Sequence, residues 1–99
     1  MLFVVLATAA PGTMKELLER RMEWSYPDGH EPIAEYWLQG TDPNEPELVA
    51  IVETESIAGI MASIAAWDDV LSFRVFPAVT AQEGLEICKK MHVPRPTPY

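Results

Sequence analysis

The side chains best suited to acid–base chemistry stand in a loop near residue 30. His30 follows a Pro-Asp-Gly turn, is next to Glu31 and precedes Glu35 by five residues. Histidine titrates near neutral pH and can take up or release a proton during a reaction. This grouping predicts His30 as a general base, with Glu35 as its acid–base partner. The alternative is a solvated loop histidine without a chemical role.

Two adjacent aspartates offer a second candidate carboxylate. Asp68 and Asp69 follow a predicted helix, where the helix dipole disfavours negative charge by roughly 0.3 to 1 kcal/mol each. A locally unfavourable choice without evident gain can mark a functional site. Asp68 is therefore the other possible partner of His30. The alternative is a solvated acidic turn that leads into the last strand.

No persuasive metal motif is present. His30, Glu31 and Glu35 could be imagined around a cation, but they lack the paired-histidine spacing that characterises zinc sites. His92, near the C-terminal end, is a weaker candidate for chemistry than His30. We therefore expect neither a metal nor a cofactor.

Aromatic residues cluster near the ends of the two long predicted helices. We expect them to line a cleft for a planar apolar ligand, with His30 at its mouth and Tyr36 as its floor. The alternative is that some of them are ordinary core aromatics. The ligand-binding residues predicted in this way are Trp24, Tyr26, Tyr36 and Trp67.

The elements that must position these residues follow from hydrophobic periodicity. The order is strand, helix, strand, strand, helix, strand, with a short C-terminal helix, which is typical of a split β-α-β fold with both helices on one side of an antiparallel sheet. Thr13 with Glu16, and Thr80 with Glu83, predict capping boxes at two helix starts. The strands are expected at 2–7, 33–39, 48–54 and 71–79, and the long helices at 14–24 and 57–67.

Prolines predict the order of the strands. Pro32 begins the second strand and Pro77 lies inside the fourth, and proline is confined to edge strands because it lacks a backbone donor. The continuous apolar runs 2–6 and 48–52 are typical of central strands. Both signals favour the ferredoxin-like order 4-1-3-2.

The sheet is too apolar for one of its faces to meet water. Pairing the middle strands places Tyr36 on the helix side, and Trp37 with Ile51 on the other side. That second face has an apolar centre with charges at its margin, as subunit interfaces have. We expect a homodimer through the face that includes Trp37, Ile51 and Arg74, with Arg74 meeting Glu35 or Glu53 across the interface. The alternative is a monomer.

Composition limits the remaining possibilities. The 99 residues predict one domain over 1–91 and a proline-rich tail over 92–99, and the net charge of -8 argues against nucleic-acid binding. Cys88, the sole cysteine, falls on an apolar helical stripe, is read as packing and suits a reducing cytoplasm. The apolar start lacks the positive region of a signal peptide, and no run reaches the roughly 20 residues that span a bilayer. We expect a cytoplasmic protein with no membrane partner.

Several short segments make the chain resemble the dimeric α/β-barrel superfamily, and within it a small family known as a domain of unknown function. The resemblance covers about residues 1 to 88 and implies a homodimer with sheets packed face to face and a cleft in each subunit. It supplies no reaction. The segments are Met1-Leu2-Phe3, Pro11-Gly12, Tyr26-Pro27-Asp28-Gly29, Trp37, Glu53-Thr54, Trp67-Asp68-Asp69 and Phe73-Arg74-Val75-Phe76-Pro77-Ala78-Val79-Thr80.

The better-known relatives in that superfamily include cofactor-free monooxygenases, haem-degrading enzymes, lactone isomerases and stress-responsive proteins. Asn44 is the only asparagine and lies between strands, and no histidine falls on the second helix. An oxygenase site centred on asparagine, or a haem ligand, therefore does not transfer. Fold alone assigns no function.

Two function classes remain. The first is a non-catalytic protein that binds a small apolar or aromatic ligand between sheet and helices. The second is a cofactor-independent oxygenase or isomerase that uses His30 with Glu35 or Asp68. Few polar groups converge on the predicted cleft, which favours binding. A purely structural dimer is the third possibility.

Overall fold

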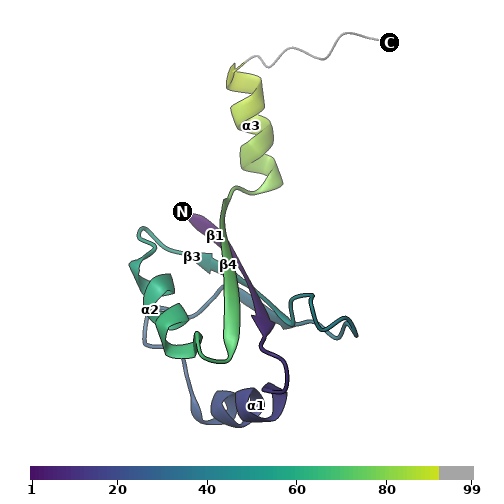
Figure 1. Cartoon of the computed structure of the whole chain (residues 1–99). Coiled ribbons are helices and arrows are strands. Elements are labelled where there is room, and N and C mark those ends of the chain that lie inside the picture. The colour runs from purple at the N-terminus through teal and green to yellow at the C-terminus, as the bar shows by residue number, and fades with distance from the viewer. Residues whose placement is uncertain (92–99) are drawn as a thin grey trace, which may run out of the picture.

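The computed structural model describes residues 1–91, and its elements follow the predicted order (Figure 1). His92 and the predicted tail over 92–99 lie outside the described residues. The elements are β1 (Leu2–Ala9), α1 (Met14–Glu23), β2 (Ala34–Trp37), β3 (Leu48–Glu53), α2 (Ala58–Trp67), β4 (Leu71–Ala78) and α3 (Ala81–Met91).

The four strands form one antiparallel sheet in the order β2-β3-β1-β4. This confirms the predicted α+β class and the order 4-1-3-2. Pro32 precedes β2 and Pro77 lies in β4, so both prolines belong to the edges of the sheet, where a missing backbone donor is tolerated. Within the described chain the sheet is open and does not close into a barrel.

The hydrophobic core lies between one face of the sheet and α2. Phe3 and Val5 on β1 pack with Ala50 on β3 and Ile60 on α2. In contrast, α1 contributes no buried residue. The core is small for a chain of this length, because in the described residues only seven hydrophobic side chains are buried: Phe3, Val5, Ala7, Ala50, Ile60, Trp67 and Val70.

The predicted register between β2 and β3 is wrong by one residue. In the structure Glu35 stands opposite Ala50, and Trp37 stands opposite Leu48. Directly opposed residues of an antiparallel pair point to the same side of the sheet. Because Ala50 and Leu48 belong to the core side, Glu35 and Trp37 face the helices. Tyr36 therefore points to the opposite face and is 60% exposed.

This register changes the predicted interface face. Trp37 leaves it, whereas Ile51 and Arg74 stay on it, opposite Val4 and Leu6 of β1 respectively. Arg74 cannot meet Glu35 there, since Glu35 lies on the other side of the sheet. The guanidinium of Arg74 instead lies 5.2 Å from the centre of the Phe76 ring within the same chain.

The two predicted capping boxes have different outcomes. The backbone N–H of Glu83 donates to Thr80 Oγ1 at 3.0 Å, which confirms the cap before α3. At α1 the prediction is wrong, because the Thr13 hydroxyl donates to the carbonyl of Ala10 at 2.6 Å. Thr13 thus closes the Pro-Gly turn that leads into α1, where Gly12 adopts φ of 76°.

The last helix extends away from the sheet (Figure 1). Its apolar residues Leu85, Ile87 and Met91 are exposed. This extension raises the radius of gyration to 17.1 Å, compared with about 13 Å for a compact chain of about 100 residues. In residues 1–91, none of the helices has the length and apolar character needed to cross a membrane.

Candidate functional site

A large cavity lies between the core side of the sheet and the two helices α1 and α2. Its volume is about 680 Å³, within the range of about 300 to 1,000 Å³ that is usual for small-molecule sites. α1 borders the cavity without burying any of its own residues. Its walls come from α1 and α2, from the connections between α1 and β2 and between β2 and β3, and from all four strands.

Three tryptophans line this cavity: Trp24, Trp37 and Trp67. Trp24 makes edge-to-face contacts with Tyr26 and Trp67, with ring centres 4.6 and 5.6 Å apart. Such pairs contribute about 0.5 to 1.5 kcal/mol beyond the burial of area. The rings of Trp24, Tyr26 and Trp67 therefore brace one another, whereas Trp37 lines the cavity from β2. The chain has no other tryptophan.

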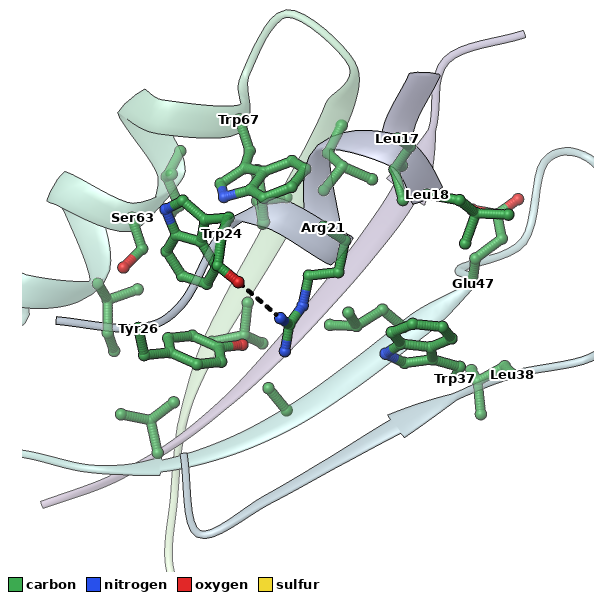
Figure 2. A pocket seen from close by; sticks show the side chains of 18 of the residues that line it. Leu17, Leu18, Arg21, Trp24, Tyr26, Trp37, Leu38, Glu47, Ser63 and Trp67 are labelled. Atoms are coloured by element: carbon green, nitrogen blue, oxygen red, sulfur yellow. Dashed lines mark hydrogen bonds between the residues drawn. The ribbon is translucent and has the colours of Figure 1, made fainter. Parts of the chain in front are cut away.

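Arg21 crosses the cavity from α1 toward the sheet, between Tyr26 and Trp37 (Figure 2). Its guanidinium donates to the carbonyl of Trp24 at 3.1 Å and lies 3.4 Å from Glu35 Oε2. It also lies 5.5 and 5.4 Å from the ring centres of Trp24 and Tyr26, which is the range of cation–π contact. Arg21 thus ties α1 to the loop and to β2.

Glu35 is the acceptor on which three parts of the site converge. Its carboxylate accepts hydrogen bonds from the hydroxyl of Tyr26, from Trp37 Nε1 at 2.7 Å, and from Arg21. The side chain is only 13% exposed. A carboxylate can remain charged at such a position because charged and neutral donors replace the water that it has lost.

These contacts shift the pKa values of Glu35 and Tyr26. Burial raises the pKa of Glu35, but the hydrogen bonds from Tyr26 and Trp37 and the charge of Arg21 together outweigh burial, so the pKa lies below its ordinary value. Burial, and next the hydrogen bond to Glu35, raise the pKa of the Tyr26 phenol. At neutral pH the site therefore holds a carboxylate, a guanidinium and a neutral phenol.

His30 lies against the first turn of α2 and lines the cavity. A Cβ placed on Gly59 would be 2.7 Å from His30 Nδ1, closer than real Cβ contacts come. The backbone N–H of His30 donates to the carbonyl of Pro27 at 3.0 Å, closing a turn in which Gly29 has φ of 80°. Gly29, through its positive φ, and Gly59, through its missing Cβ, thus allow His30 to lie against α2.

The paired aspartates do not join this site. Asp69 accepts two hydrogen bonds from Arg20, at 2.8 and 2.9 Å, and so connects the end of α2 to α1. These hydrogen bonds hold the pKa of Asp69 below its ordinary value. Asp68 is the exposed C-cap of α2 and is not among the residues of the cavity wall.

The structure brings together four of the predicted site residues around the cavity: Trp24, Tyr26, Trp67 and His30. Their role in binding stays a prediction. Glu35 joins them through Tyr26, whereas Tyr36 points away from the cavity. Sequence reasoning missed Arg21 and misplaced Trp37. An arginine within the predicted helix gives no signal of its contacts, because its partners come from other elements.

The cavity is bordered by acidic side chains at its polar edge. Among residues 1–91, no group of three His, Cys, Asp or Glu residues lies close enough to hold a metal ion. Because Arg21 is paired with Glu35, its charge is already compensated. The acidic residues of the edge are Glu31, Asp42 and Glu47.

Comparison with protein families finds a match over residues 1–92 to the family described as Domain of unknown function (DUF3303). Comparisons with curated proteins and with solved structures found no match. The match covers every element described above, including the whole wall of the cavity.

Proposed function

We propose that this chain, which belongs to the DUF3303 family, binds a small, planar, largely apolar molecule in the cavity between its sheet and its helices. The observation that carries the proposal is the cavity of about 680 Å³ lined by three tryptophans, of which Trp24 and Trp67 contact each other edge to face. A chain with so small a core would gain by packing α1 against the sheet. The polar cluster of Arg21 and Glu35 instead holds the space open.

The charges of the wall support a neutral ligand. Arg21 and Glu35 compensate each other, and the donors of Tyr26 and Trp37 are already taken by Glu35. An anionic ligand would have to compete with Glu35 for Arg21 and would also meet the acidic edge of the cavity. A neutral ring can stack on the exposed parts of the aromatic wall without breaking these contacts.

We also propose that two copies pack through the open face of the sheet, as in the dimeric α/β-barrel superfamily. Ile51 and its neighbours present an apolar surface that a soluble monomer rarely exposes. Residues of this face alternate with those that face the helices along each strand. The apolar members of the face are Leu2, Val4, Leu6, Ala34, Tyr36, Val49, Ile51, Phe76 and Ala78.

The enzyme alternative has less support. A general base needs a free lone pair and a pKa near the working pH, whereas Glu35 accepts three hydrogen bonds and has a lowered pKa. Asp68 lies outside the cavity wall, which leaves His30 without a carboxylate partner of the kind expected. A purely structural dimer would leave the cavity without a purpose.

The three tryptophans make the proposal directly testable. Each gives one indole N–H signal in a ¹H–¹⁵N correlation spectrum, and all three line the cavity. Titration with naphthalene is expected to shift all three signals along one saturable curve. Backbone signals of α3, which lies away from the cavity, should stay unchanged.

Two variants of α2 separate the cavity from the rest of the helix. Ser63→Phe places a ring into the cavity wall and is expected to abolish the shifts. Ala65→Phe adds the same ring at an exposed position of the same helix and should leave them intact. The proposal is wrong if toluene, naphthalene and phenanthrene all fail to give saturable shifts with the unaltered protein.

A further inference from the structure

Gly59 is the second residue of α2, and glycine is the least favourable helix residue after proline. The close approach of His30 explains this choice, since the nearest side-chain atoms to a Cβ at Gly59 would be Nδ1, Cε1 and Cγ of the His30 imidazole, at 2.7, 3.0 and 3.9 Å. The helix thus accepts an unfavourable residue at the one point where the imidazole lies against it. The contact therefore serves to place the His30 side chain, and it is not needed to form the sheet.

His30 is exposed overall and borders two hollows. It lines the large cavity and also a smaller one of about 150 Å³, whose wall includes Trp24, Pro27 and Ala62. Imidazole can accept a hydrogen bond at one nitrogen and donate at the other. Within the described hydrogen bonds, the donors of Tyr26, Trp37 and Arg21 serve Glu35 or the Trp24 carbonyl, whereas the His30 side chain serves neither.

We infer that His30 determines the specificity of the cavity by accepting a hydrogen bond from a hydroxyl group on an aromatic ligand, so that the ligand class is a neutral phenol. The inference rests on the proposed function. The neighbouring Glu31 carboxylate, also in the wall, favours a donor on the ligand and disfavours a ligand carboxylate. Gly59 and Gly29 are positioning residues, because they act through the place of His30.

The test compares three ligands that share one ring system: naphthalene, 1-naphthol and 1-naphthoate. Their dissociation constants are measured from the tryptophan indole shifts at neutral pH. We expect 1-naphthol to bind roughly three- to tenfold more tightly than naphthalene, as one added hydrogen bond allows, and 1-naphthoate to bind least tightly. Equal binding of 1-naphthol and naphthalene would overturn this inference and leave the proposed function standing.

Variants then assign the preference to His30. Gly59→Ala adds a methyl group that must displace the imidazole, and it also raises helix propensity, so the protein should stay folded. It is expected to remove the preference for 1-naphthol while naphthalene still binds. Gly84→Ala is the matched control in α3, where the added Cβ meets only Val79 at an ordinary 3.8 Å, and it should keep the preference.

Substitution of His30 itself completes the test. His30→Ala should lose the preference, and His30→Gln should keep part of it, because the amide oxygen can still accept a hydrogen bond. A preference that survives in both Gly59→Ala and His30→Ala would contradict the assignment. Failure of naphthalene to bind any of these proteins would count against the proposed function instead.

Discussion

The hydroxyl of Tyr26 donates a hydrogen bond to the carboxylate of Glu35, joining the loop after α1 to the edge strand β2. Tyr26 lines the cavity, and this contact places its neutral phenol next to a charged carboxylate. Arg21 and Trp37 donate to the same carboxylate. Glu35 therefore has a structural task, and its removal has consequences for both stability and binding.

Replacement of Glu35 by glutamine should destabilise the protein by about 1 to 3 kcal/mol. The substitution removes the charge of a largely buried acceptor and leaves Arg21 without its partner. Urea denaturation measures the effect as a lower midpoint. The control is Glu19→Gln, because Glu19 is exposed and pairs with Lys15 at 3.9 Å, and its loss should cost less than about 0.5 kcal/mol. Equal effects of the two substitutions would contradict the role of Glu35.

The hydrogen bonds to Glu35 also predict how the stability of the folded protein depends on pH. Because the pKa of Glu35 is lowered on folding, its contribution is fully present above its ordinary value of 4.5 and is lost as the pH falls from there through the lowered pKa. Urea midpoints measured from pH 7 downward should therefore converge for the unaltered protein and Glu35→Gln. A difference between the two proteins that persists at the lowest pH would speak against this account.

Truncation of Trp67 should remove the brace between α1 and α2. Its side chain is 6% exposed, contacts Trp24 edge to face, and lies 5.4 Å from the guanidinium of Arg20. Trp67→Ala is expected to cost roughly 3 to 5 kcal/mol, and Trp67→Phe clearly less, because the smaller ring still fills part of the space. Calorimetry or urea denaturation would rank the stabilities of the unaltered protein, Trp67→Phe and Trp67→Ala. Equal stabilities of the two variants would refute the prediction.

The open sheet face predicts a dimer of about twice 11.1 kDa by light scattering. Ile51→Glu should dissociate it, since a charge at the centre of an apolar interface must be desolvated without a partner. Ala65→Glu adds the same charge at an exposed position of α2 and should leave the dimer intact. A monomeric mass for the unaltered protein at micromolar concentration, without loss of solubility, would refute the dimer.

Sequence reasoning predicted the order of elements and strands because long apolar runs and edge prolines carry strong signals. It could not predict the register of β2. That strand has only four residues, and both of its alternations, Ala34 with Tyr36 and Glu35 with Trp37, mix polar and apolar side chains. The long connection before β3 does not fix the pairing of β2 with β3 either. A shift of this pairing by one residue moves every side chain of β2 to the opposite face of the sheet.

Four wall residues of the candidate site were predictable from the sequence, namely Trp24, Tyr26, Trp67 and His30. Aromatic residues at the ends of two helices on one side of a sheet favour a common aromatic wall, whereas the contact between the Trp24 and Trp67 rings is a finding of the structure. The acceptor role of Glu35 depends on donors from α1, the following loop and β2 itself, which no local pattern reports. Gly59 was the one missed signal, because a glycine inside an apolar helix often marks a close approach by another group.

The projecting helix α3 also affects how the mass of this protein should be measured. A radius of gyration of 17.1 Å is what the size relation for compact proteins gives for roughly 220 residues, more than twice the length of this chain. A single copy would therefore elute from a sizing column calibrated with globular standards where a globular dimer is expected. Elution volume cannot distinguish one copy from two, whereas scattered intensity reports mass independently of shape.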